Sequence, residues 1–563
     1  NVSVGAASLD ANTTGSNNTA CGKSALSANT TGDNNTALGT SALLSITTNG
    51  ACTAVGYQAL RDNTQSNNTG LGYQALRLNT TGSNNVAVGL QAGNVNTTGS
   101  QNTFIGYQSA DANTTGDANT CVGYAALGAN TTGSYNTAVG EQALDANTTG
   151  SYNTAVGRQA LTSQTGTGQN DAFGNRAAYG VTTGSANVCL GNHAGYNITT
   201  GDNNVVIGRY AIGDSGGTGN NCTSDNNVII GLTAGTQLTT GGNNVAVGAY
   251  ALDVCTSGPN NVCMGRSSLG GLTTGQDNTA IGHEAMDACT TGSYNTAVGY
   301  QALDEITTGT RNTAVGYRAL AGPGDGSHNT AVGQAAMENQ TTGERNVAVG
   351  QYAGQSITTG DNNVCVGQDA GQVLTTGSQN VFVGMDAGDT VTTGGQNIAI
   401  GCNANPGATV NTSVVIGHDL GGQGNNTAII GGTSGAYNGA NSSSWSTTSD
   451  RRIKKNIVNN DSGLDKLKQI QVRNFEYKTQ DEIKTDNPEL TDVAKSTAVD
   501  KQGLQLGVIA QEIEEVLPEV VKTQSTGVKA VNPDNLTWYL VNAVKELSAE
   551  NNALKARLDA AGL

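Results

Sequence analysis

The chain has 563 residues, with 26 Lys and Arg against 43 Asp and Glu, a net charge of −17, and only 4% aromatic residues. Residues 1–449 hold 10 basic against 25 acidic side chains, which excludes a nucleic-acid partner, because phosphate binding requires clustered Lys and Arg. No run of apolar residues approaches the length of about 18 that a membrane span needs, so we expect no membrane insertion.

A seventeen-residue repeat fills the chain from residue 1 to residue 431. One copy begins Asn295-Thr296-Ala297-Val298-Gly299, and the glycine that ends this core recurs from Gly5 to Gly431 at nearly constant spacing. A period this short over hundreds of residues predicts a mainly β fold, a parallel β-roll or β-solenoid of stacked coils. The composition, rich in Gly, Asn and Thr, is also found in disordered tracts, but those tracts hold no fixed phase.

Two positions of the repeat predict its local structure, counting the core glycine as zero. Position −4 is Asn in 23 of 26 copies. Stacked Asn side chains can hydrogen-bond along a ladder, so we assign this row a structural role. The pattern also predicts two short extended segments per coil, separated by the Thr-Thr-Gly turn and by the close approach that the core glycine permits.

Positions −2 and −1 are both apolar, although successive side chains on a strand point to opposite faces. The first strand is therefore predicted to be covered on both sides, by the coil interior and by another copy of the chain. Because each coil is thin, we expect a homotrimer in which three rolls pack around an axis. The repeat is similar to the β-roll of trimeric autotransporter adhesin heads, whose units also carry an Asn before an Ala-(Ile or Val)-Gly core, although the adhesin period is typically shorter.

The ten cysteines include no Cys-x-x-Cys pair. Cys121, Cys189, Cys263 and Cys365 lie two residues before a core glycine, where Ala is usual, and Cys21 lies one before. We interpret them as small hydrophobic residues rather than disulfides or metal ligands, and we expect no metal and no cofactor.

The shaft shows only weak signals of a binding or catalytic site. The longer interval before Gly231 contains residues 214–219, which predict a protruding loop, either a recognition surface or a tolerated insertion. Carboxylates such as Asp33, Asp202 and Asp361 are scattered over turn positions and form no pair of the kind that glycoside hydrolysis needs. The adjacent Thr residues point opposite ways on a strand, which disfavours an ice-binding face.

Composition changes abruptly after the repeats. Residues 432–448 form a linker rich in Gly, Ser, Asn and Thr, which leads up to a candidate cleavage site. Charged residues make up 34 of the 114 residues from Asp450 onward, against 35 of the first 449. This shift predicts a separate C-terminal domain at residues 449–563.

Two motifs in this domain resemble those of the peptidase S74 family. The first is Ser449-Asp-Arg-Arg-Ile-Lys-Lys-Asn-Ile457 and the second is Gly507-Val-Ile-Ala-Gln-Glu-Ile513. The family is the intramolecular chaperone domain at the C-terminus of phage tail fibres, tailspikes and endosialidases, and the resemblance covers residues 449–563. It implies a small α+β chaperone domain.

The resemblance also implies a self-cleaving Ser–Lys dyad. Ser449 would be the nucleophile, Lys454 the base, and Thr448–Ser449 the bond that is cut. A serine hydroxyl is a weak nucleophile until a base removes its proton, and a lysine can do so only when its pKa is lowered. The reaction would turn over once, as an autoproteolytic serine peptidase, with no substrate turnover in the shaft. The residues that would support the dyad are Asp450, Arg452 and Asn456. The matching residues of the second motif, the chaperone motif, are Gly507, Ala510, Gln511 and Glu512.

The end of the chain carries apolar residues at alternating spacings of three and four, which predict the seam of a coiled-coil helix. Asn551 falls at an a position, where a polar residue costs stability but sets the register between parallel helices. The alternative is an amphipathic helix packed on its own domain. The seam consists of Leu540, Val544, Leu547, Asn551, Leu554 and Leu558.

Together these observations predict a homotrimeric phage tail fibre or related virion spike, extracellular after assembly in the host cytoplasm. Its partners would be its own copies, a host-surface receptor or glycan, and the virion through an upstream part, since the chain begins at Asn1 without Met. The C-terminal domain would align the chains in one register and then cleave itself off. A cell-surface trimeric adhesin with the same chaperone and a tailspike glycan hydrolase are the two alternatives.

Overall fold

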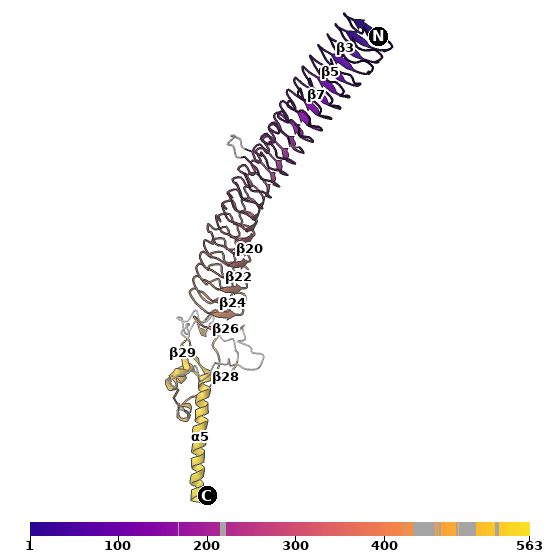
Figure 1. Cartoon of the computed structure of the whole chain (residues 1–563). Helices are drawn as coiled ribbons and strands as arrows, with labels where there is room; N and C mark the ends of the chain where they lie inside the picture. Colours follow the sequence, from indigo (N-terminus) through magenta and orange to yellow (C-terminus); the bar gives the residue numbers. More distant parts are fainter. Residues whose placement is uncertain are drawn as a thin grey trace. The chain divides into compact units, whose positions relative to one another are not determined.

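In the computed structural model, the structure describes residues 1–166, 168–213, 221–422, 424–431, 457–458, 460, 463–479, 482–483, 503–523 and 528–562. The chain divides into two compact units, Asn1–Thr342 and Gly343–Leu563. Both contain coils of a parallel β-solenoid with the repeat's period, which confirms the predicted fold class (Figure 1). The predicted domain boundaries at residues 431 and 449 stay a prediction.

Each coil contributes one strand of three residues, which ends immediately before the core glycine. In the first unit these strands are β1 (Val2–Val4), β2 (Thr19–Cys21), β3 (Thr36–Leu38), β4 (Thr53–Val55), β5 (Thr69–Leu71), β6 (Val86–Val88), β7 (Thr103–Ile105), β8 (Thr120–Val122), β9 (Thr137–Val139), β10 (Thr154–Val156), β11 (Asp171–Phe173), β12 (Val188–Leu190), β13 (Val205–Ile207), β14 (Val228–Ile230), β15 (Val245–Val247), β16 (Val262–Met264), β17 (Thr279–Ile281), β18 (Thr296–Val298), β19 (Thr313–Val315) and β20 (Thr330–Val332). In the second unit they are β21 (Val347–Val349), β22 (Val364–Val366), β23 (Val381–Val383), β24 (Ile398–Ile400), β25 (Val414–Ile416) and β26 (Ala428–Ile430).

Neighbouring strands within each unit pair in parallel, with equivalent repeat positions opposite one another. Thr296 of β18, for example, lies opposite Thr313 of β19. The core glycine makes this stacking possible: Gly299 has φ +140°, and a Cβ there would lie 2.3 Å from the carbonyl oxygen of Gly316 in the next coil. A side chain at this position would therefore force the coils apart.

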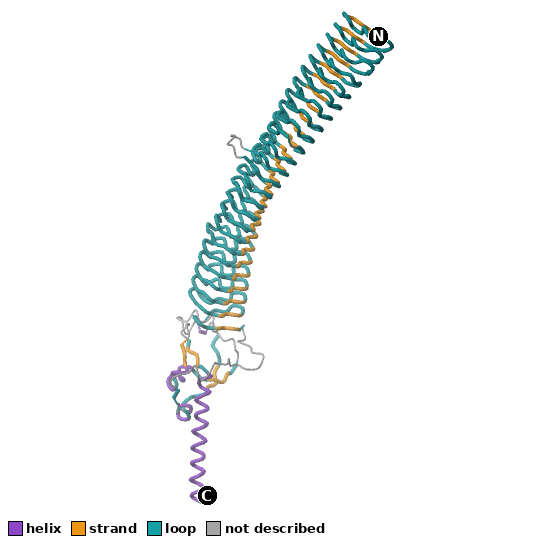
Figure 2. The backbone as a smooth tube through the Cα atoms, viewed as in Figure 1, coloured by secondary structure: helices purple, strands orange, loops and turns teal. Residues whose placement is uncertain are grey.

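The prediction of a second extended segment in each coil is wrong. The residues after the core glycine form consecutive turns, drawn as loop in Figure 2. Two of them adopt left-handed backbone angles, as at Gln301 (φ 51°) and Leu303 (φ 55°), which is incompatible with a strand. The geometry directs Ala302 and Leu303 into the coil, where both are fully buried beside Ala297 of the strand.

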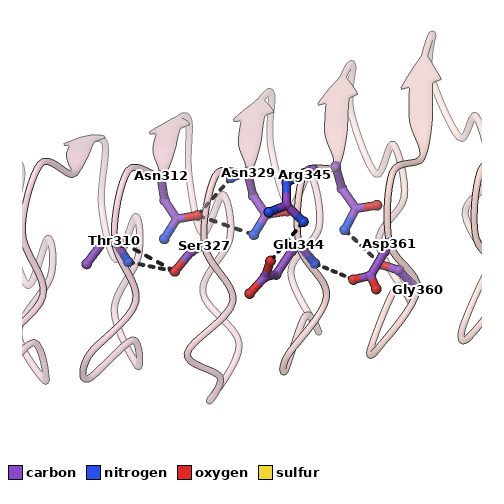
Figure 3. Close-up of polar contacts among 9 residues, drawn as sticks. Thr310, Asn312, Ser327, Asn329, Glu344, Arg345, Gly360 and Asp361 are labelled. Carbon is purple, nitrogen blue, oxygen red and sulfur yellow. Dashed lines mark hydrogen bonds and ion pairs between the residues drawn. The ribbon is translucent and has the colours of Figure 1, made fainter.

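The Asn ladder at position −4 is confirmed. In the first unit the side-chain oxygen of Asn312 accepts a hydrogen bond from the backbone N–H of Asn329 at 2.9 Å (Figure 3). The side-chain amide of Asn312 donates to the carbonyl of Gly326 at 2.9 Å. Because these side chains are buried, the ladder satisfies backbone groups that would otherwise be orphaned in the interior.

The predicted burial of the cysteines is confirmed for the four at position −2 and is wrong for Cys21, because a side chain at position −1 points away from the coil interior. The four at position −2, Cys121, Cys189, Cys263 and Cys365, are fully buried and free, whereas Cys21 at position −1 is exposed. Burial raises the pKa of the Cys189 thiol to about 12, so this thiol stays protonated and acts as a small apolar group.

The C-terminal part of the second unit is a small α/β region built around one long helix. Its buried core consists of Ile513, Leu517, Val520 and Tyr539. β27 pairs antiparallel with β28, and β29 pairs antiparallel with β30. The elements are α1 (Leu464–Leu467), β27 (Arg473–Phe475), β28 (Gln505–Gly507), α4 (Ala510–Val516), the 3-10 helix η3 (Pro518–Val520), β29 (Val521–Thr523), β30 (Lys529–Val531) and α5 (Pro533–Ala561).

Candidate functional site

The predicted dyad lies outside the described residues, so its geometry stays a prediction. This holds for the nucleophile, the base, the scissile bond and the supporting positions, namely Thr448, Ser449, Asp450, Arg452, Lys454 and Asn456. The described parts of the predicted domain include the residues immediately downstream of the dyad motif and the second motif.

The segment directly after the dyad motif is held on α5. The side-chain amide of Asn542 donates to the carbonyl of Asn460 at 2.6 Å. The backbone N–H of Leu464 donates to the carboxylate of Glu546 at 2.7 Å. Gly463 lies so close to the helix that a Cβ there would be 2.4 Å from the backbone nitrogen of Ala543. The chain downstream of the dyad therefore has a fixed attachment to the long helix.

The second motif connects β28, which pairs with β27, to α4. Gly507 ends β28, where a Cβ would lie 3.0 Å from the ring of Phe475, so a larger residue would press on this ring. Ala510 begins α4, Gln511 is exposed, and Glu512 forms a two-pronged ion pair with Arg473 of β27 (Nη2–Oε1 3.0 Å, Nε–Oε2 3.2 Å). The described contacts of the motif are thus structural rather than catalytic.

A second polar cluster fixes α5 against the domain. The hydroxyl of Tyr539 donates to the carboxylate of Glu519, and Lys466 lies 3.8 Å from the same carboxylate. The hydrogen bond from Tyr539, with the nearby Lys466 charge, lowers the pKa of Glu519, and the same bond raises the pKa of Tyr539. Each group is thereby stabilised in the form it has at neutral pH.

Sequence reasoning missed the residues that make these connections. Arg473, Glu519, Glu546 and Asn542 have no motif of their own. Two signals were available for the contact of Arg473. Arg473 is a charged residue in a stretch where apolar and polar residues largely alternate, which is typical of a strand, and its partner Glu512 lies in the acidic first turn of α4. The partners of Glu546 and Asn542 are 82 residues away in sequence, so only the tertiary structure brings them together.

The predicted seam on α5 is exposed, in contrast to the helix face that packs on the domain. Leu540, Val544, Leu547 and Leu554 have exposed fractions of 56, 58, 53 and 53%. Tyr539 and Ala543, on the packed face, are 8% and 4% exposed. Leu558 and Asn551 are also exposed, as is every residue from Leu547 to Gly562. The amphipathic-helix alternative therefore accounts for the packed face and leaves the seam uncovered.

The scattered carboxylates of the shaft have structural partners. The carboxylates of Asp33 and Asp361 accept hydrogen bonds from the backbone N–H of Ser16 (2.6 Å) and Glu344 (2.7 Å) in the preceding coil. Figure 3 shows the Asp361 contact in the second unit. Asp202 accepts from the N–H of Ser185 at 2.6 Å in the same way. The loop at residues 214–219 lies outside the described residues.

A family comparison decides the nature of the C-terminal region. Residues 449–522 match the model of Peptidase S74, described as chaperone of endosialidase. The chain carries a chaperone-of-endosialidase domain. The match spans both motifs of this S74 domain, including the undescribed dyad and the Glu512–Arg473 connection. No curated protein matches the chain.

Two other kinds of feature are absent from the described part of the chain. Within these residues no three or more His, Cys, Asp or Glu side chains are grouped so as to hold a metal ion. Over the same ranges, no helix combines the length and apolar character needed to span a membrane.

Proposed function

We propose that the chain is a trimeric fibre whose S74 domain aligns three copies and then cleaves itself off between Thr448 and Ser449. The observation that carries the proposal is α5. Its last turns are exposed on all sides, so nothing in the described part of the chain covers their leucines. A leucine seam on such a helix is stabilised by burial against identical helices, as in a coiled coil.

The solenoid supplies a second, matching surface. Side chains at position −1 point away from the coil interior and leave an apolar row along the outside of the strands. Because the row repeats with the coil spacing, the partner that fits it best is one with the same period, namely a parallel copy of this chain. Members of the row in the first unit include Leu38, Leu71, Ile105, Phe173, Leu190, Met264, Ile281 and Val315, which are 37–47% exposed.

Assembly of such a fibre poses a register problem that the C-terminal domain would solve. Nearly identical coils make a slip of one repeat between chains almost isoenergetic, and long-range β structure forms slowly with exposed edges. A helix that associates first would align three chains at one end. Removal of the aligning domain would then leave the shaft kinetically trapped.

Self-cleavage is proposed on the dyad residues. Lys454 would take the proton of the Ser449 hydroxyl while the hydroxyl oxygen attacks the carbonyl carbon of Thr448. The bond between this carbon and the Ser449 nitrogen then breaks, the nitrogen receives the proton from Lys454, and the Thr448 acyl group remains as an ester on the Ser449 oxygen. Water hydrolyses the ester to the Thr448 carboxylate and the free Ser449 hydroxyl. The products end at Thr448 and begin at Ser449. The attachment of the downstream segment to α5 through Asn460 and Leu464 supports coupling of this step to assembly of the helix.

We further propose that the fibre attaches a virion to a host surface. Support comes from the combination of an S74 domain with a β-solenoid. A cell-surface adhesin with the same chaperone is the alternative, and a membrane anchor upstream would favour it. A glycan hydrolase would be favoured by glycan turnover that is lost when a carboxylate pair is changed.

Mass measurement and denaturing gels test the proposal. The wild-type chain should give a trimer by light scattering and a body that ends at Thr448. Ser449→Ala and Lys454→Ala should leave the full-length chain on the gel while the trimer still forms. An intact wild-type chain would contradict the cleavage. A soluble trimer formed after deletion of residues 449–563 before expression would contradict the chaperone role.

A further inference from the structure

A notch lies in the side of the first unit, in the coil that follows Gly265. The fifth residue after the core glycine in this coil is Gly270, whereas Asp253 and Asp287 occupy this position in the coils before and after it. The missing side chain leaves a hollow of about 300 Å³, at the lower end of the range of about 300–1,000 Å³ for small-molecule sites. Its lining residues are Tyr250, Asp253, Arg266, Ser267, Gly270 and Asp287.

Two half-buried carboxylates flank this hollow. A Cβ at Gly270 would lie 2.4 Å from Oδ1 of Asp287, so this carboxylate reaches into the space that the glycine leaves. Asp253 is fixed from the far side, where its carboxylate accepts a hydrogen bond from the hydroxyl of Thr236. The two aspartates are two coils apart, or roughly 10 Å for a strand spacing of about 4.8 Å. Both aspartates line the hollow, and the carboxylate of Asp287 occupies the space beside Gly270.

The other lining groups complement the carboxylates. Arg266 is exposed and offers guanidinium donors, one of which lies 3.2 Å from Nε2 of His283. Tyr250 is 40% exposed and provides an apolar ring beside the polar groups. Hydrogen-bond acceptors, a planar donor and an aromatic face around one small hollow fit a molecule with several hydroxyl groups and an apolar ring face.

We propose that this notch binds one neutral hexose unit of a host-surface glycan. Asp253 and Asp287 accept hydrogen bonds from sugar hydroxyls, Arg266 donates to sugar oxygens, and Tyr250 packs against the apolar face of the ring. The acidic lining, together with the neighbouring Glu284, disfavours sugars that carry a carboxylate. The inference rests on the proposed host attachment and gives that function a place and a ligand class.

A second coil of the first unit provides a matched control. Gly128 occupies the same position between Asp111 and Asp145, and a Cβ there would lie 2.7 Å from Oδ1 of Asp145. At the position where Tyr250 precedes the notch, this coil is preceded by Gln108. The same glycine substitution can therefore be made in a coil that lacks a tyrosine at the position of Tyr250 and carries the stacked Tyr107 and Tyr124 one position earlier.

Binding of the full-length chain to an array of neutral glucose, galactose and mannose oligosaccharides, with sialylated oligosaccharides alongside, tests the site. The wild-type chain should bind neutral oligosaccharides. Gly270→Asp introduces the residue that both neighbouring coils carry at this position and fills the notch, so binding should fall at least tenfold. Tyr250→Ala should weaken binding without touching the coil interior. Gly128→Asp should leave binding unchanged.

Three outcomes would overturn the site: no binding of neutral oligosaccharides by the wild-type chain, unchanged binding by Gly270→Asp, or an equal loss in Gly128→Asp. Cell attachment that survives Gly270→Asp would remove this site and leave the proposed function standing. A chain that binds the neutral oligosaccharides but attaches to no cells would support the site and count against host attachment.

Discussion

At the scale of single residues, the repeat tolerates large departures when a neighbour compensates. Phe382 occupies the −2 position, where Ala is usual, and is fully buried. Gly388 in the same coil stands where Leu is usual, and a Cβ there would lie 2.5 Å from Cγ of Phe382. The ring thus fills the space that a leucine fills elsewhere, as Leu303 does beside Ala297.

This complementarity predicts a strong coupling between the two positions. Phe382→Ala should cost roughly 3–5 kcal/mol by leaving a cavity, and Gly388→Leu alone should be destabilising because it collides with the ring. The double variant restores the usual Ala and Leu pair and should be more stable than either single variant, with a coupling above about 1 kcal/mol. Thermal unfolding followed by circular dichroism measures the effect. Met385→Ala, an exposed change in the same coil, should be nearly neutral, and additive single effects would contradict the pairing.

At the scale of the coil, the turns after the strand stack carboxylates from neighbouring coils. Burial, reinforced by the charges of Asp287, Glu284 and Glu305, raises the pKa of Asp304 to about 6 from its ordinary 3.8. The folded state therefore holds this proton more tightly than the unfolded chain does. Protonated Asp304 therefore contributes its full share to the stability of the folded state below about pH 4, and this contribution is lost as the pH rises to about 6.

Asp304→Asn should accordingly raise the unfolding temperature at pH 7.5 and change it little at pH 4. We expect an increase of roughly 1–2 °C, because partial exposure screens the charges. Asp33→Asn is a control that should change the unfolding temperature in the opposite direction. Hydrogen bonds from Ser16 lower the pKa of Asp33, so replacing this carboxylate should lower the unfolding temperature at pH 7.5. Scanning calorimetry at both pH values checks the pair. A lower unfolding temperature of Asp304→Asn at pH 7.5 would contradict the assigned pKa shift.

At the scale of the whole molecule, two exposed apolar rows both need a partner surface to cover them. The −1 row of the solenoid and the seam of α5 are both uncovered in a single chain, and contiguous exposed apolar surface is typical of an interface. Parallel association of identical chains would cover both rows at once. The helix is the smaller of the two surfaces, so it offers the simplest test.

In the proposed trimer, Leu547→Glu places a charge in the seam and should give monomers or aggregates, because three buried carboxylates would repel at one level. Ala549→Glu adds the same charge on the opposite side of α5 and should leave the proposed trimer intact. Light scattering after size-exclusion chromatography distinguishes the outcomes. Equal behaviour of the two variants would show that the seam does not mediate association.

The sequence by itself determined the features that depend on period and local chemistry. A constant spacing of glycine and Asn requires stacked coils, so the solenoid, the strand position before Gly299 and the Asn312 ladder were all predictable. Burial of Cys189 followed from its place in a row of Ala. The S74 domain was equally predictable, since its two motifs are short and local.

Only the tertiary structure decided the features that depend on three-dimensional neighbours. Gln301 and Leu303 adopt left-handed backbone angles, although neither Gln nor Leu is a residue type that predicts such angles. The turns were therefore mistaken for a strand. Asn542 and Asn460 meet because α5 packs back on the segment after the dyad. The notch exists because stacking brings residues from three successive coils around Gly270, a relation that no linear pattern displays.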